Sequence, residues 1–299
     1  MKTDKSGAAA IEVKDLCKTF GTTRALDKVS LKVRPGEMVA LIGASGSGKS
    51  TLLKHLSGLH ISDETDSYVR VLDKTVQMKG DLNTRIRRIR ADIGFIFQQF
   101  NLVGRLSLIT NVMTGMLARI PMWRSLLGWF TLREKEMAMH ALAQVGMEAY
   151  AAQRASTLSG GQQQRAAIAR AMVQQAKIIF ADEPIASLDP ESSRKVMRSL
   201  RRVNQKLGIT VLVSLHQVDF AMQFCERCVG LRDGRIVYDG PTAGLNTALL
   251  QELYGAEFRD VEEGLDIYSQ INGQRFPANE PATEREPDVC LPELSPAKA

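Results

Sequence analysis

The pattern of apolar and polar residues predicts two kinds of strand. In residues 26–33 the apolar Val29, Leu31 and Val33 alternate with polar residues, as in a strand with one buried face. Residues 11–20 are expected to be a second strand of the same small sheet. Other apolar runs are continuous, which is typical of core strands buried on both faces. These continuous runs lie at residues 38–42, 93–97, 177–181 and 210–214.

Helices and turns are expected between and after these runs. A helix over about residues 191–206 bridges two of the core strands, and residues 100 to about 172 read as a largely helical region. Near the end of the folded part, residues 231–238 are predicted to form a hairpin around an Asp-Gly turn. The alternation of strands and helices predicts an α/β fold.

A glycine-rich loop directly follows the run at residues 38–42. Residues 43–51 read GASGSGKST, which has the spacing of a phosphate-binding P-loop. The glycines let backbone N–H groups curl around phosphate oxygens, and the helix that starts near Lys49 points its positive end at the same anion. Lys49 is expected to reach the β- and γ-phosphates, and the Ser50 hydroxyl to hold Mg²⁺. The expected phosphate-binding residues are Gly43, Ala44, Ser45, Gly46, Ser47, Gly48, Lys49, Ser50 and Thr51.

Two carboxylates end another buried run. Asp182 and Glu183 follow residues 177–181, at the carboxyl end of a strand, where open α/β sheets bind ligands. Asp182 suits the outer sphere of Mg²⁺, and Glu183 is placed to take a proton from an attacking water. Taken alone, such a pattern is often only a strand end. Together with the P-loop it predicts nucleotide hydrolysis.

A third motif, LSGGQ, occupies residues 158–162 and precedes a helical stretch at 163–172. Ser159 is a good N-cap, and Gly160 and Gly161 leave the helix N-terminus open to an anion. A capped surface helix that binds nothing is the alternative. As a second phosphate-contacting surface, the motif could not fold onto its own P-loop and would serve a partner subunit.

With these motifs the chain closely resembles the nucleotide-binding subunit of ATP-binding cassette (ABC) transporters, whose signature is LSGGQ. The resemblance covers roughly residues 10–255. It implies a P-loop NTPase of the ABC ATPase type, in which a RecA-like core carries an antiparallel β-subdomain and a helical signature subdomain. We therefore expect a nucleotide-binding domain at 11–255, with the helical subdomain at about 100–172.

The same resemblance assigns roles residue by residue. Phe20 matches the aromatic residue that stacks on adenine, and Gln98 matches the Q-loop glutamine that touches Mg²⁺ or water. Asp189 matches the D-loop at the dimer interface, and His216 matches the switch histidine beside the γ-phosphate. The implied catalytic residues are Glu183, His216 and Lys49, the metal residues are Ser50, Gln98 and Asp182, and further nucleotide contacts come from Phe20, Gln98, Ser159, Gly160, Gly161, Gln162 and Asp189.

Composition adds limits to this picture. The net charge is +6, and much of the excess lies in residues 85–90. That run could contact nucleic acid or anionic lipid, but it is better explained as the solvated face of a short helix with Ile86 and Ile89 packed inward. No interleaved aromatic residues support base stacking, so no nucleic-acid partner is expected.

The cysteines and the lengths of the apolar runs bear on where in the cell the protein is expected. Cys225 and Cys228 have CxxC spacing, but a zinc site needs about four ligands, so they are interpreted as thiols at a helix or strand edge, with metal a remote alternative. With Cys17 and Cys290 they fit a reducing cytosol. No apolar run reaches the roughly 18 residues of a membrane span, so a soluble chain is expected.

Beyond about Ala256, prolines, glutamates and a lack of periodicity predict a mostly disordered tail at 256–299. This tail is too short for the regulatory domain that some importers carry.

Within the family, several stretches resemble the ATPase subunit of phosphonate importers. They are residues 97–102, 105–107, 120–128, 183–190 and 215–219. The insertion around Trp123, which also holds Trp129, is expected to fill the core of the helical subdomain, to form a docking surface for the permease, or to do both. The segment 62–69 departs from the pattern because it lacks a glycine usual before the next strand.

The resemblance implies a homodimer that binds ATP and Mg²⁺ at the cytoplasmic face of a bacterial inner membrane. Two transmembrane permease subunits and a periplasmic binding protein are the implied partners. Importers of phosphite or phosphate esters would look nearly identical. A soluble ABC ATPase in DNA repair or translation, and a regulatory subunit that senses nucleotide without turnover, are the remaining alternatives. A single cassette argues against the first, and the presence of Glu183 and His216 argues against the second.

Overall fold

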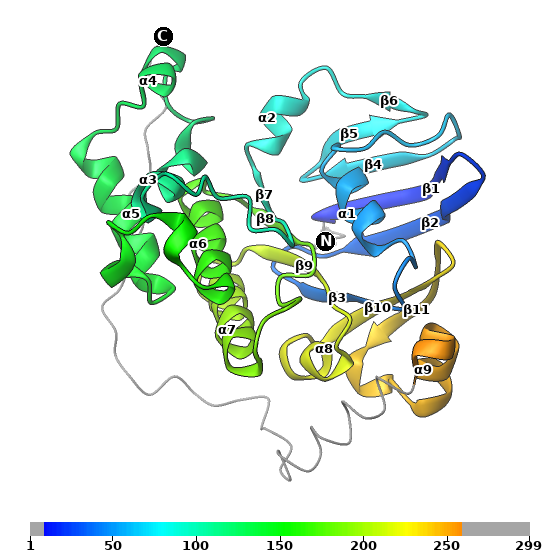
Figure 1. Cartoon of the computed structure of the whole chain (residues 1–299). Helices are drawn as coiled ribbons and strands as arrows, with labels where there is room; N and C mark the ends of the chain where they lie inside the picture. Colours follow the sequence, from blue (N-terminus) through cyan, green and yellow to red (C-terminus); the bar gives the residue numbers. More distant parts are fainter. Residues whose placement is uncertain (1–8, 259–299) are drawn as a thin grey trace, which may run out of the picture.

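A computed structural model describes residues 9–258 (Figure 1). Its centre is a six-stranded sheet with the strand order β11-β10-β3-β9-β8-β7, parallel except for the edge strand β11. Every residue of the adjacent strands β3, β9 and β8 is buried, which confirms the prediction made from their continuous apolar runs. The strands are β3 (Met38–Ile42), β7 (Ile93–Ile96), β8 (Ile178–Ala181), β9 (Thr210–Ser214), β10 (Arg227–Arg232) and β11 (Arg235–Pro241).

A second, five-stranded antiparallel sheet has the order β2-β1-β4-β5-β6. On β2 the side chains of Val29, Leu31 and Val33 are buried while the intervening residues are exposed, as the alternation predicts. These strands are β1 (Ile11–Phe20), β2 (Thr23–Val33), β4 (Tyr68–Val71), β5 (Lys74–Met78) and β6 (Asp81–Leu82). Helix α1 (Lys49–Leu56) packs between the two sheets, because its leucines share one apolar cluster with residues from both.

The opposite face of the central sheet is covered by helices, which Figure 1 shows beside β7 to β9. A helical subdomain lies at one side and holds α3 (Leu108–Met113), α4 (Met122–Leu127), α5 (Leu132–Gln144) and α6 (Gly160–Val173). Helix α6 is its centre and contacts α3, α5, α7 and β7. The remaining helices are α2 (Ile86–Arg90), α7 (Pro190–Leu207), α8 (Val218–Phe224) and α9 (Thr247–Tyr254).

The arginine-rich run forms the short helix α2, as predicted. Ile89 is buried and Ile86 packs against the same apolar cluster. Arg90 is not simply solvated, because its guanidinium donates hydrogen bonds to the carbonyl oxygens of Ser57 and Gly58 at 3.1 and 2.6 Å. Part of the basic run therefore anchors α2 to the chain that follows α1.

One of the two readings of the Trp123 insertion is wrong. No residue of α4 is buried, and Trp123 and Trp129 are 55% and 59% exposed. Their rings contact each other edge to face, with centroids 5.7 Å apart. Helix α4 and Trp129 are therefore not part of the core of the helical subdomain, whereas Ile120, just before α4, is buried in it.

Both cysteines of the CxxC pair are buried. Cys225 caps the end of α8 and Cys228 lies in β10, and burial raises the pKa of each thiol to about 12. No group of three or more metal-ligating residues of the His, Cys, Asp and Glu types occurs within residues 9–258. In the same range no helix is both long and apolar enough to cross a membrane.

The sequence places the start of the tail too early. Residues Gly255–Glu257 form a 3-10 turn, and the side chain of Phe258 is buried in the main apolar cluster. Residues 256–258 therefore belong to the folded part. The rest of the predicted tail, residues 259–299, lies outside the described residues.

Candidate functional site

The P-loop joins β3 to α1 and requires glycine at specific positions. Gly43 and Gly48 have φ angles of 140° and 106°, which residues with a side chain rarely adopt. A Cβ on Gly43 would lie 2.1 Å from the Leu231 carbonyl oxygen, and one on Gly48 would lie 2.6 Å from the Ala25 carbonyl oxygen. Gly48 caps α1 without a side-chain hydrogen bond, which leaves the helix N-terminus open to an anion.

Lys49 is the first residue of α1 and its side chain is only 4% exposed. Its ammonium group donates to the carbonyl oxygens of Gly43 and Ala44 at 2.7 and 2.8 Å, and to the Ser47 hydroxyl at 3.4 Å. Burial lowers its pKa, and the nearby carboxylates of Glu183, Glu257 and Asp182 act in the opposite direction. The ammonium thus sits within the loop where phosphate is expected.

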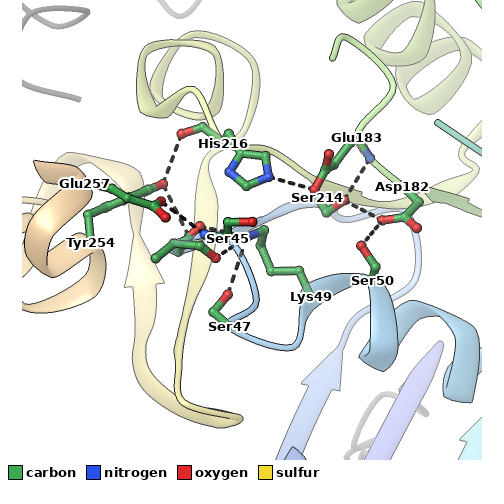
Figure 2. Close-up of polar contacts among 12 residues, drawn as sticks. Ser45, Ser47, Lys49, Ser50, Asp182, Glu183, Ser214, His216, Tyr254 and Glu257 are labelled. Atoms are coloured by element: carbon green, nitrogen blue, oxygen red, sulfur yellow. Dashed lines mark hydrogen bonds and ion pairs between the residues drawn. The ribbon is translucent and has the colours of Figure 1, made fainter. Parts of the chain in front are cut away.

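The two acidic residues that follow β8, Asp182 and Glu183, lie next to the P-loop at the carboxyl ends of the strands. The Ser50 hydroxyl donates to Asp182 Oδ1 at 2.7 Å (Figure 2). Strands β7 and β8 run in parallel register, and the Asp182 amide donates to the Ile96 carbonyl oxygen, so Gln98 follows at the same sheet edge. The hydroxyl and carboxylate oxygens of Ser50 and Asp182 are ligands that Mg²⁺ prefers, so these residues fit a magnesium ion.

Glu183 and His216 come from the ends of two neighbouring strands, β8 and β9. Glu183 Oε1 lies 2.7 Å from His216 Nε2 (Figure 2). The hydrogen bond from His216 is the main reason that the pKa of Glu183 is lowered, with burial acting against it. The carboxylate therefore stays ionised at neutral pH, which a proton acceptor requires.

The signature motif lies on the helical subdomain. Ser159 is the exposed N-cap of α6 and forms a capping box with Gln162, in which the Ser159 amide donates to the Gln162 side chain at 2.8 Å. A Cβ on Gly160 would lie 2.9 Å from Leu188, and one on Gly161 would lie 2.8 Å from Ser192. The two glycines thus allow the start of α6 to pack against the start of α7.

The other residues carried over from the resemblance are placed as follows. Asp189 is exposed and caps its own helix, α7, through a 2.9 Å hydrogen bond from the Ser192 amide. Phe20 is 45% exposed at the end of β1, with the Lys18 ammonium 5.4 Å from its ring centroid. Gln98 is exposed in the loop after β7. Among the described residues, no hydrogen bond joins the signature motif or Asp189 to the P-loop.

Three residues at the site were not singled out from the sequence. Ser214 bonds to both acidic positions, the Tyr254 hydroxyl accepts from the Gly43 amide, and the Glu257 carboxylate accepts from the Ser45 amide. Only Ser214 gave a local signal in the sequence, because it is the polar residue that ends an apolar strand two positions before His216. Tyr254 and Glu257 lie more than 200 positions from the loop that they contact, as the separations of 211 and 212 show.

Known proteins share both this sequence and this fold. The phosphonates import ATP-binding protein PhnC of Maricaulis maris is 59% identical over 259 residues, which span 87% of this chain and 98% of that protein. PhnC 1 of Cupriavidus metallidurans is 60% identical over 249 residues, covering 83% of this chain and 88% of that protein.

Solved structures give the same result. The dimeric, ADP- and phosphate-bound ATP-binding cassette MJ0796 is 34% identical with a TM-score of 0.66, and it matches 79% of this chain and 100% of its own. CbiO1 of Clostridium perfringens shares the fold. It is 24% identical with a TM-score of 0.68, and the match covers 87% of this chain and 98% of its own. The family model described as ABC transporter matches residues 26–186. The chain therefore belongs to the ABC transporter family and has the fold of its ATP-binding cassette, as the resemblance implied.

Proposed function

We propose that this protein is the ATP-hydrolysing subunit of an importer that carries phosphonates. The observation that supports it most directly is the Glu183–His216 contact, at 2.7 Å, beside a complete P-loop. The relatives named for phosphonate import are 59% and 60% identical over most of the chain, which favours the same substrate class.

In this proposal the chain's own residues divide the work of hydrolysis. The P-loop amides and the positive end of α1 bind the phosphates, and Lys49 exchanges its carbonyl partners for phosphate oxygens. Ser50, Asp182 and Gln98 would hold Mg²⁺, which offsets phosphate charge when it is bound. Glu183 accepts the proton of the attacking water, and His216 holds that carboxylate in place. Phe20 offers an exposed ring face to adenine.

The signature motif and Asp189 complete the site from a second copy of the chain. Ser159 is exposed and lies on a different subdomain from its own P-loop, which supports a role in trans. The related cassette MJ0796 is described as dimeric, which supports the same arrangement. Two nucleotides would then lie between two copies, each held by one P-loop and one opposing Ser159.

We infer that the exposed apolar surface around α4 contacts the membrane-spanning permease. Six large apolar side chains there are exposed to solvent: Met122, Trp123, Leu126, Leu127, Trp129 and Leu132, by 78, 55, 79, 73, 59 and 72%. Apolar patches of this kind commonly mark interaction surfaces. Permease binding would hold the subunit at the cytoplasmic face of the inner membrane, with a periplasmic binding protein delivering the substrate.

The test is ATP hydrolysis by the reconstituted transporter. Turnover should rise when the binding protein carries a phosphonate, and it should not rise with methionine or a sugar. A Glu183→Gln complex serves as the control that removes hydrolysis alone. Stimulation by phosphite or by phosphate esters in place of phosphonates would change the substrate assignment and leave the ATPase assignment intact.

A further inference from the structure

Ser214 is the last residue of β9, and none of its side chain is exposed to solvent. Its hydroxyl lies between the two acids that follow β8. It donates to Asp182 Oδ1 at 3.0 Å and accepts from the Glu183 amide at 2.8 Å (Figure 2). A single buried hydroxyl thus joins the side chain of one acid to the backbone of the next.

The three residues that precede Ser214 on β9 are apolar, so its hydroxyl lies in an otherwise apolar part of the strand. Val211, Leu212 and Val213 are fully buried and apolar, and the strand forms parallel ladders with β3 and β8. Burying a hydroxyl costs free energy unless it forms hydrogen bonds. The Ser214 hydroxyl offsets that cost by forming two hydrogen bonds, both with residues of the candidate catalytic site.

The backbone of Glu183 is strained, and this gives a specific role to the hydrogen bond from its amide to Ser214. Glu183 has a φ of 47°, in the left-handed region that residues other than glycine seldom adopt. Such a conformation persists only where surrounding contacts hold it. The Ser214 hydroxyl fixes the Glu183 amide, while His216, two residues further along, holds the Glu183 carboxylate at 2.7 Å.

Asp182 depends on the same hydroxyl. Its Oδ1 atom accepts from both Ser50 and Ser214. Ser50 is the residue expected to turn toward a magnesium ion, and such a turn would take its hydrogen bond away from Asp182. The Ser214 bond does not involve the P-loop, so it keeps Asp182 oriented in either state.

We propose that Ser214 is a positioning residue, which holds Asp182 and Glu183 in a fixed relation so that one faces the metal and the other faces the attacking water. The proposal rests on the proposed ATP hydrolysis. Residues that hold metal ligands in place typically contribute 10- to 100-fold to metal affinity or activity. The expected contribution of Ser214 is of that order, about 10- to 100-fold.

The test compares Ser214→Ala with Thr210→Val. Thr210 starts the same strand, is 2% exposed, and its hydroxyl accepts from the Gly36 amide at 2.9 Å, so it is a matched buried hydroxyl at the far end of β9. Ser214→Ala should lower kcat by about 10- to 100-fold and raise the Mg²⁺ concentration for half-maximal activity, with little change in the KM for ATP. Thr210→Val should change neither, even where both variants lower the melting temperature equally. Ser214→Thr retains the hydroxyl and should restore most of the activity if it folds.

A second readout does not require turnover. In Ser214→Ala, Asp182 is less well held, so the affinity of the ATP-bound isolated chain for Mn²⁺, measured by EPR, should fall by about 10- to 100-fold. In Thr210→Val the affinity for Mn²⁺ should equal that of the wild type. An unchanged affinity for Mn²⁺ or an unchanged kcat in Ser214→Ala, or equal losses in both variants, would overturn the proposal. A wild-type chain that binds ATP but does not hydrolyse it would instead overturn the proposed function, and the Mn²⁺ comparison would still decide the role of Ser214.

Discussion

The Glu257 carboxylate accepts a hydrogen bond from the Ser45 amide at 3.1 Å, so an acid from the last turn of the described chain lies on the P-loop. Tyr254, one turn earlier, connects the same loop to His216. Its hydroxyl accepts from the Gly43 amide at 3.3 Å and donates to the His216 carbonyl oxygen at 3.2 Å. The end of α9 is therefore packed against the site expected to bind phosphate.

The first prediction follows from this contact. A phosphate group and the Glu257 carboxylate would compete for the Ser45 amide, and their negative charges would repel each other. Glu257→Gln should therefore lower the Kd for ATP by about 3- to 10-fold, because hydrogen bonds to charged groups are the stronger ones. Isothermal titration of the isolated chain measures it. Glu252→Gln, an exposed change on α9, is the control, and an equal or higher Kd in Glu257→Gln would contradict the competition.

The second prediction concerns the general base. Glu183→Gln keeps the shape of the side chain but cannot take a proton from water, so turnover should fall by on the order of 10²- to 10⁴-fold. ATP binding should persist, and the dimer should remain closed because the reset step is lost. Phosphate release and size-exclusion chromatography with ATP measure the two effects. Wild-type turnover in this variant would refute the role of Glu183.

The third prediction tests the composite site. Ser159→Arg should abolish hydrolysis but leave ATP binding by the monomer intact, because Ser159 caps α6 and makes no described contact with its own P-loop. Mixing this variant with Lys49→Ala should restore part of the activity, since one of the two sites in the heterodimer keeps both wild-type residues. A Ser159→Arg monomer that loses ATP affinity as Lys49→Ala does would argue against the arrangement in trans.

The fourth prediction separates docking from packing at α4. Trp123 is 55% exposed, so Trp123→Ala should change the free energy of unfolding by only about 0.5 kcal/mol. It should weaken assembly with the permease while the ATPase activity of the free subunit persists, and pull-down with detergent-solubilised permease measures this. Met222→Ala, at an apolar residue on α8 that is 42% exposed, is the matched control. Equal permease binding by both variants would remove α4 from the interface.

The fifth prediction is a pH dependence. The pKa of Glu183 is lowered from its ordinary value of 4.5, mainly by the hydrogen bond from His216. A lowered carboxylate pKa contributes stability that is fully present above the unfolded value and is lost as the pH falls through the folded value. The difference in unfolding free energy between wild type and His216→Ala should therefore be present above about pH 4.5 and shrink below it. Urea denaturation of both proteins between about pH 3 and about pH 7 measures this difference in unfolding free energy. A difference that does not change with pH would contradict the Glu183–His216 hydrogen bond.

Local patterns in the sequence determined much of this molecule. The apolar runs define the core strands, the glycines of residues 43–48 define a loop that only small residues can form, and Asp233-Gly234 forms its turn with both φ angles positive. Each of these signals acts between residues close in the chain, through backbone freedom or the period of a strand. The family resemblance then supplied the order of the motifs, and the fold agrees with it.

Tertiary structure alone decided the remaining features. The exposure of the Trp123 insertion could not be predicted, because an apolar segment reads the same whether it packs inward or faces solvent. The contact between Ser45 and Glu257 joins residues 212 positions apart, and Ser214 meets Glu183 across 31 positions. Such contacts depend on the order and register of the strands and on where α9 packs. No local spacing of residues encodes them, because they form only when the sheet brings distant strand ends to one edge.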